Sequence, residues 1–292
     1  MANSINTNAG ALVALQNLNQ TSRDLNVTQN RVNTGLKISS AKDNGAIFAI
    51  ATAQRAEMGA QDAVKQSLQR GQSIVDVALA AGETVTSALN ELKSLAVAIQ
   101  DDAGNASPAT DWSDNGKKLI ADFEALVKEI HVSLAGAKFD GVNLFDAAAA
   151  TVEVTTNTSG GKFELKANGA ASAGTDLLFG GTVDATTKAW STTADYATKK
   201  AGYTAANVET AINAFASTLA DLGTKSKSLD RQLTFTSKMQ DALEVGIGNL
   251  VDADLAKESA KLTALQTKQQ LGVQALGIAN QSGSILLGLF RG

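Results

Sequence analysis

Two long stretches of this sequence carry mostly small or apolar residues at alternating steps of four and three, the spacing of a coiled-coil seam. The stretches run from Val64 to Ile99 and from Val208 to Leu250. A seam sustained over about five to six heptads calls for partner helices packed side by side. The seam residues expected in the interior are Val64, Leu68, Val75, Leu89, Ile99, Ile212, Phe215, Leu219, Leu229, Leu233 and Leu243.

A single proline among 292 residues permits helices of unusual length. We therefore expect a mostly α-helical protein with a long antiparallel coiled-coil rod formed by its N- and C-terminal segments. Residues 41–145 and 203–250 form the rod, and residues 1–40 and 251–292 form terminal helices. Loop signals at Asn44-Gly45, and at Gly246 and Gly248, separate the terminal helices from the rod.

Residues 146–202 lose the helical period and are rich in Thr, Ser, Ala and Gly. Residues 151–155 and 162–166 alternate apolar and polar side chains, with a Gly-containing loop between them. This pattern predicts a β-hairpin. We therefore expect a small β-containing insert on the surface, at the centre of the chain.

The two ends of the chain carry weaker versions of the seam, interrupted by polar residues. Residues 284–292 add five large apolar side chains within six positions, more than one partner helix can cover. One interpretation is a C-terminal helix that folds back onto its own core; the other, which we favour, is an interface between subunits. The residues expected in that interface are Leu15, Leu18, Leu25, Val32, Leu255, Leu262, Leu265, Leu276, Leu286, Leu287, Leu289 and Phe290.

Composition excludes several kinds of site. The chain has no cysteine, and His131 is its only histidine, so thiolate zinc sites and multi-histidine metal sites are excluded. A net charge of −4 offers no basic face for nucleic acid, and no apolar stretch is long enough for a membrane span. We expect no secretory signal and no catalytic, cofactor or metal site. His131 is expected to be a partly exposed helical residue, and Trp112 and Trp190 to cover local clusters rather than to bind a ligand.

The sequence contains short motifs of one enzyme class, the serine β-lactam-binding enzymes. Ser39 and Lys42 have the S-x-x-K spacing, residues 113–115 read S-D-N, and Glu164 and Asn168 have the E-x-x-x-N spacing. No K-T-G follows, and Glu164 falls in the expected hairpin. The alternative interpretation is structural: Ser39 and Ser40 mark a helix boundary, and Ser113 or Asp114 caps the helix that follows.

Several motifs resemble those of bacterial flagellins. Residues 34–44, TGLKISSAKDN, are similar to the family's S-G-L-R-I-N-S-A-x-D-D, and residues 138–144, KFDGVNL, to its F-N-G-x-x-L turn. The closest match lies in residues 252–262, DADLAKESAKL, and 279–292. The resemblance covers about residues 1–145 and 203–292. It departs from the family pattern at Gly45 and Ile47.

The resemblance implies a structural subunit that polymerises into the extracellular flagellar filament and has no active site. It also implies export through the flagellar export apparatus, an export chaperone bound to the C-terminal segment, and contacts with filament cap and hook–filament junction proteins. The alternative within this class is a hook–filament junction protein, which has flagellin-like ends. A cluster of Thr and Ser in the insert gives candidate O-glycan positions, the alternative being a solvated loop without sugars: Thr155, Thr156, Thr158, Ser159, Ser191, Thr192 and Thr193.

Overall fold

The computed structural model of the chain describes residues 8–105, 111–146, 149, 151–167, 179, 182–183 and 190–289. It is mostly helical, with a small β-hairpin in the central part of the chain, so the predicted fold class is confirmed. The elements are α1 (Ala9–Thr34), α2 (Gly45–Asn105), α3 (Asp114–Gly136), β1 (Val152–Thr155), β2 (Lys162–Leu165), β3 (Thr182–Val183), β4 (Trp190–Ser191), α5 (Tyr196–Gly202), α6 (Ala205–Val251) and α7 (Leu255–Leu289).

The chain forms two compact units, each of which receives part of α2 and part of α6. The terminal unit comprises residues 1–58 and 241–292, and the central unit comprises residues 59–240. The sequence-based division instead sets its boundaries near residues 40 and 250 and separates residues 146–202. The hairpin of this insert belongs to the central unit.

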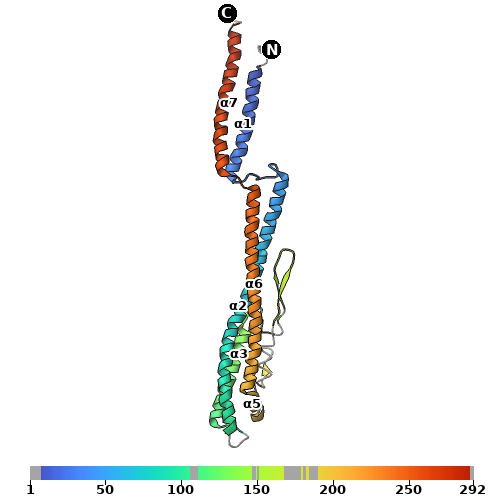
Figure 1. Cartoon of the computed structure of the whole chain (residues 1–292), viewed down its shortest axis with the longest axis vertical. Helices are drawn as coiled ribbons and strands as arrows, with labels where there is room; N and C mark the ends of the chain where they lie inside the picture. The colour runs from blue at the N-terminus through green and yellow to red at the C-terminus, as the bar shows by residue number, and fades with distance from the viewer. Residues whose placement is uncertain are drawn as a thin grey trace. The chain divides into compact units, whose positions relative to one another are not determined.

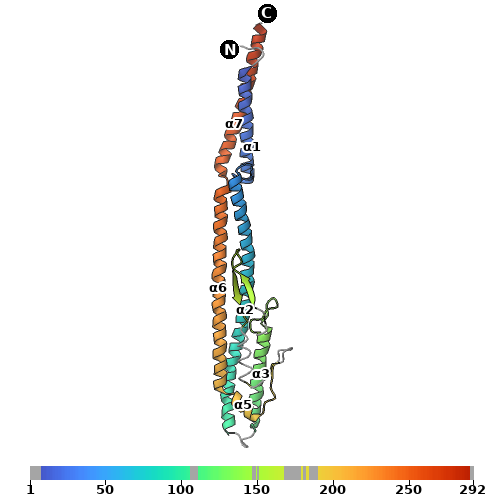
Figure 2. The same cartoon turned by 90° about the vertical axis from the view of Figure 1, so that its right-hand side faces the viewer.

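In the central unit, α2 and α6 run antiparallel, with α3 beside them (Figures 1 and 2). Lys93 pairs with Glu209 at 3.3 Å, and Gln72 Nε2 donates to Ser226 Oγ at 2.7 Å. The α2 seam residues are buried there, as are Phe215 and Leu229, whereas Ile212, Leu219 and Leu233 are half-buried against the same core. Leu243 is half-buried in the terminal unit.

Helix α3 supplies one face of the central core. Ser113 is its N-cap, accepting a hydrogen bond from the backbone N–H of Gly116 at 3.0 Å, so the capping prediction is confirmed. The expectation of a partly exposed His131 is wrong, because this side chain is only 4% exposed. The buried face of α3 includes both Ile130 and His131, and the helix continues for more than a turn to Gly136.

The predicted hairpin is confirmed, with β1 antiparallel to β2. Val154 and Leu165 are buried in the central core, the Thr155 N–H donates to Ser67 Oγ of α2 at 3.0 Å, and Gln232 of α6 donates to the Thr156 carbonyl at 2.9 Å. The hairpin is therefore anchored to both long helices. Trp112 and Trp190 also belong to the main core, so the expectation that they cover local clusters is wrong.

In the terminal unit, α1 and α7 lie side by side and antiparallel (Figures 1 and 2). Near one end Asn8 Nδ2 donates to the Ala279 carbonyl at 2.6 Å, and near the other Arg31 pairs with Glu258 at 3.1 Å. The expected loop at Gly246 and Gly248 is wrong, because α6 continues through both glycines. Its residue Ile247 packs in a small buried cluster with Ile38, Ala51 and Val251, which holds the segment helical. Among the described residues, no helix is long and apolar enough to cross a membrane.

Candidate self-association surface

Backbone hydrogen bonds fix the points where α1 ends and α7 begins. Gly35 caps α1 with a left-handed φ of 71°, and its N–H donates to the Arg31 carbonyl at 2.9 Å. The segment after it pairs with the segment before α7: Lys37 N donates to Val251 O at 2.7 Å, and Ala253 N to Gly35 O at 2.9 Å. These bonds hold the end of α1 and the start of α7 next to each other.

The S-x-x-K motif belongs to a turn that precedes α2. The Asp43 carboxylate accepts hydrogen bonds from the backbone N–H groups of Ser39 and Ser40 at 3.0 Å, and from both hydroxyls at 3.2 Å. These donors hold the pKa of Asp43 below its usual value, because they stabilise the charged carboxylate. Asn44 then caps α2 by accepting from the Ile47 N–H at 3.1 Å. The two serines therefore mark a helix boundary; Asn168, the other end of the E-x-x-x-N spacing, lies outside the described residues.

The inward positions of α7 follow the expected stripe, with steps of three and four. They run from Glu258 through Leu262, Leu265, Gln269 and Gly272 to Leu276. On α1 the structure buries Thr21, Leu25 and Thr28, whereas Leu15 is exposed in the single chain. A search for apolar residues misses two of these inward positions, because they are threonines.

The pair buries little of its apolar surface. Of the expected interface residues, Leu25 and Leu265 are buried, at 8% and 9% exposed. Leu15 and Leu255 are exposed. The half-buried ones are Leu18, Val32, Leu262 and Leu276. The side chains of Leu286, Leu287 and Leu289, and the whole of Phe290, lie outside what the structure describes.

Several exposed apolar residues of the pair lie outside the sequence-based set. Leu12 is 60% exposed, Leu271 59% and Ile278 68%, and Val13 and Val273 are similarly open. On α7 these residues lie outside the inward stripe, so apolar side chains are exposed on more than one side of the helix. Exposed apolar residues that gather on one element mark an interaction surface. Apolar residues outside the stripe are the signal in the sequence that could have identified this surface.

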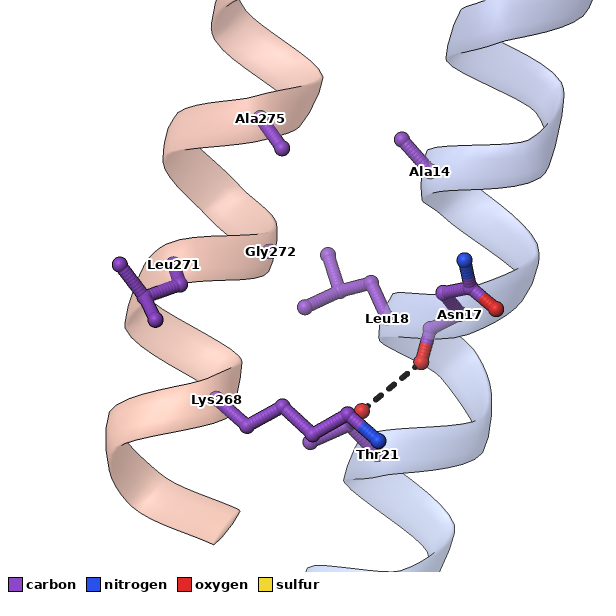
Figure 3. Close-up of a pocket in the computed structure, with 8 residues that line it drawn as sticks. All are labelled: Ala14, Asn17, Leu18, Thr21, Lys268, Leu271, Gly272 and Ala275. Atoms are coloured by element: carbon purple, nitrogen blue, oxygen red, sulfur yellow. Dashed lines mark hydrogen bonds between the residues drawn. The ribbon is translucent and has the colours of Figure 1, made fainter. Parts of the chain in front are cut away.

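A shallow cavity of about 240 Å³ lies between the two helices (Figure 3). Its walls combine small and aliphatic side chains, and Lys268 extends from α7 toward Thr21 of α1. The Thr21 hydroxyl is satisfied within α1, donating to the Asn17 carbonyl at 2.9 Å. The lining residues are Ala14, Asn17, Leu18, Thr21, Lys268, Leu271, Gly272 and Ala275. No group of three metal-ligating side chains occurs here or elsewhere in the described part of the chain.

Comparison with known proteins gives matches along almost the whole chain. Residues 5–150 match the bacterial flagellin N-terminal helical region, and residues 205–290 match the bacterial flagellin C-terminal helical region. Flagellin FljK of Caulobacter vibrioides is 50% identical over 289 residues, which cover 99% of each chain. A flagellin of Brucella melitensis is 38% identical over 293 residues, again 99% of each chain. A crystal structure of Bacillus cereus flagellin aligns with 68% of this chain and 94% of its own, at 18% identity and a TM-score of 0.33.

Proposed function

From the premise that this chain belongs to the bacterial flagellin family, we propose that its α1·α7 pair is the surface through which copies of the chain polymerise. The chain is a structural subunit of the extracellular flagellar filament and not an enzyme. Its relatives match it over their whole length and carry the name flagellin, which favours a filament subunit over a junction protein.

The exposed apolar side chains of α1 and α7 are the observation that carries this proposal. Leu12, Leu271 and Ile278 each leave more than half of their surface open. Burying a side chain of this size contributes about 1.5–3 kcal/mol. Several such residues on one helix pair supply enough free energy to hold a neighbouring copy.

The cavity between α1 and α7 supports the same assignment. An aliphatic side chain of a neighbouring subunit can enter beside Ala14, Leu271 and Ala275, because these residues leave the groove open and mainly apolar. Contacts of this kind join unlike surfaces of successive copies. If such contacts do not close into a ring, they generate a helical filament.

We further propose that different segments of the chain occupy different layers of the filament. Residues 1–40 with 251–292 form the filament core, residues 41–145 with 203–250 form the surrounding helical shell, and residues 146–202 face outward. The candidate O-glycan positions Thr158, Ser159, Ser191 and Thr193 are exposed, which makes them accessible to modification. Thr155, Thr156 and Thr192 are half-buried and are the weaker candidates.

We also propose that an export chaperone binds residues 251–292 before secretion. Exposed apolar residues such as Leu271 and Ile278 would otherwise allow subunits to associate inside the cell. The filament cap, the hook–filament junction proteins and the export apparatus complete the proposed set of partners.

Replacing Ile278 with Asp tests the surface. Ile278 is 68% exposed in the chain, so the substitution should leave the helical content of the monomer unchanged. It should abolish assembly, because the charge would be buried between subunits without a partner. Sedimentation measures polymerisation, and circular dichroism measures folding.

Val132→Asp is the matched control, since Val132 of α3 is 67% exposed and lies in the central unit. This variant should still polymerise. If Ile278→Asp assembles normally, α7 is not part of the interface. If Val132→Asp blocks assembly equally, the terminal pair has no special role in polymerisation.

A further inference from the structure

Helices α1 and α7 have few large apolar contacts to define their register. The inward face of α1 includes Ala14, Thr21 and Thr28, and that of α7 includes Gln269 and Gly272. Small and polar residues lose little apolar contact when one helix slides past the other by a heptad. In coiled coils, a polar group at one seam position often fixes the register, at some cost in stability.

We propose that the Arg31–Glu258 ion pair, acting with the backbone hydrogen bonds that join the adjoining ends of the two helices, sets the register in which α1 and α7 pair. Arg31 Nη1 lies 3.1 Å from Glu258 Oε1, and the Glu258 side chain is only 13% exposed. Its second oxygen, Oε2, is buried and has no hydrogen-bond partner among the described residues. Loss of Arg31 would therefore leave a nearly buried, uncompensated carboxylate, which is far more costly than the pair is stabilising.

The positions of the two charges in their helices add to this preference. Arg31 lies in the last turn of α1, and Glu258 lies in the first turn of α7. A cation at a helix C-terminus and an anion at a helix N-terminus both interact favourably with the helix dipole. The native register brings these two ends together.

A shift of one heptad is unfavourable in either direction. In one direction Glu258 would lie opposite Asp24, a residue of like charge, seven residues before Arg31. In the other direction Glu258 would pass beyond Thr34, where α1 ends, and Arg31 would lie opposite Leu265. Each shifted register therefore contains either two repelling charges or an unpaired charge. Coiled coils discriminate between registers through such unfavourable contacts.

Disulfide cross-linking can measure the register directly, because the chain has no cysteine of its own. A Cβ at residue 272 would lie 3.9 Å from Leu18 Cβ, which is a suitable separation for a disulfide. The double variant Leu18→Cys/Gly272→Cys therefore reports the native register. Leu18→Cys/Ala279→Cys reports a shift of one heptad in the direction that places Arg31 opposite Leu265. The readout is the ratio of the two disulfide yields within single chains, in monomer and in filament.

With the native charges, the first reporter should dominate. Arg31→Glu should lower the ratio by at least about tenfold, since it places two carboxylates together. The exchange Arg31→Glu/Glu258→Arg should restore much of the ratio, although each charge then faces the less favourable helix end. Arg23→Glu makes the same charge change on α1 at an exposed position, where Arg23 bonds only to Gln20 within α1 among the contacts described, and should leave the ratio unchanged.

An undiminished ratio in Arg31→Glu, or an exchange variant that does not recover, would overturn the proposal. This inference refines the proposed function but fails separately from it. The disulfides form within one chain, so they report the register even if subunits polymerise through another surface. Conversely, Ile278→Asp tests the surface without altering either charge.

Discussion

Helices α1 and α3 have similar lengths, 26 and 23 residues, but they are buried to very different degrees. Helix α3 buries seven residues, including Phe123, Val127 and Ile130, in the central core. Helix α1 buries three, and two of these are threonines. Helical pattern alone therefore does not make a self-sufficient unit. The central unit buries a large apolar core within one chain, whereas the α1·α7 pair buries few apolar residues and leaves much of its own surface open.

The largest expected effect distinguishes the cores of the two units. Phe123 is fully buried. Its ring stacks on that of Tyr203, with 4.5 Å between the ring centroids, and lies edge-on to the ring of Phe179, with 5.3 Å between the centroids. Phe123→Ala should destabilise the monomer by about 3–5 kcal/mol in urea unfolding. Leu265→Ala in α7 should leave that transition nearly unchanged. An equal loss from Leu265→Ala would mean that the terminal pair is as tightly folded as the centre.

A second prediction concerns the close approach of α2 and α6. A Cβ at residue 82 would clash with Leu219 Cδ2, whereas a Cβ at residue 223 of α6 would meet nothing within 4 Å. The Leu219 side chain must then move, so overpacking in Gly82→Ala opposes the gain in helix propensity that alanine brings. Gly223→Ala should stabilise by about 0.5–1 kcal/mol through helix propensity alone. Gly82→Ala should therefore have the lower urea midpoint of the two variants, and equal midpoints would contradict tight packing at Gly82.

The central unit should also lose stability at alkaline pH through Tyr203. Burial raises the pKa of Tyr203, with the nearby Glu124 carboxylate adding to the effect. The unfolded chain releases this proton above about pH 10, whereas the folded chain retains it, so stability falls as the pH rises further. Tyr203→Phe should be less stable near pH 8, because the 3.1 Å hydrogen bond to Glu124 is lost. It should show a smaller further loss between pH 9 and 11, and an unchanged alkaline slope would exclude Tyr203 as the cause.

The smallest expected effect compares two helix caps. Ser113 caps α3, and Asn8 caps α1 by accepting from the Ala11 N–H at 3.1 Å. Ser113→Ala should lower monomer stability by about 1 kcal/mol. Asn8→Ala should leave monomer unfolding unchanged, because α1 contributes little to that transition. Thermal melts followed by circular dichroism provide the comparison.

The sequence predicted the central seam well, because its buried positions are large and apolar. Residues such as Val64, Leu68 and Phe215 repeat at a strict spacing and are buried in the structure. The hairpin was predictable for a similar reason, since apolar and polar residues alternate in both strands. Its anchoring through Ser67 and Gln232 was not predictable, because single hydrogen bonds between distant segments leave no periodic pattern.

Sequence reasoning failed where polar or small residues occupy inward positions. Thr21 and Thr28 are buried in α1, and a search for apolar residues does not find them. Gly246 and Gly248 read as a loop because glycine is a poor helix former, yet packing around Ile247 keeps them helical. Leu271, Val273 and Ile278 of α7 were missed for a different reason: a search for one stripe describes one face of a helix and ignores the others.

Hydrogen exchange of residues 9–34 and 255–281, compared between monomer and filament, tests the central claim most directly. The account predicts that the amides of these two segments exchange rapidly in the monomer, while those of α3 are protected there. In the filament, the amides of both segments should become protected. Mass spectrometry of peptic peptides resolves the helices separately. Equal, strong protection of α1 and α3 in the monomer would contradict the account, because the terminal pair would then be stable without its neighbours.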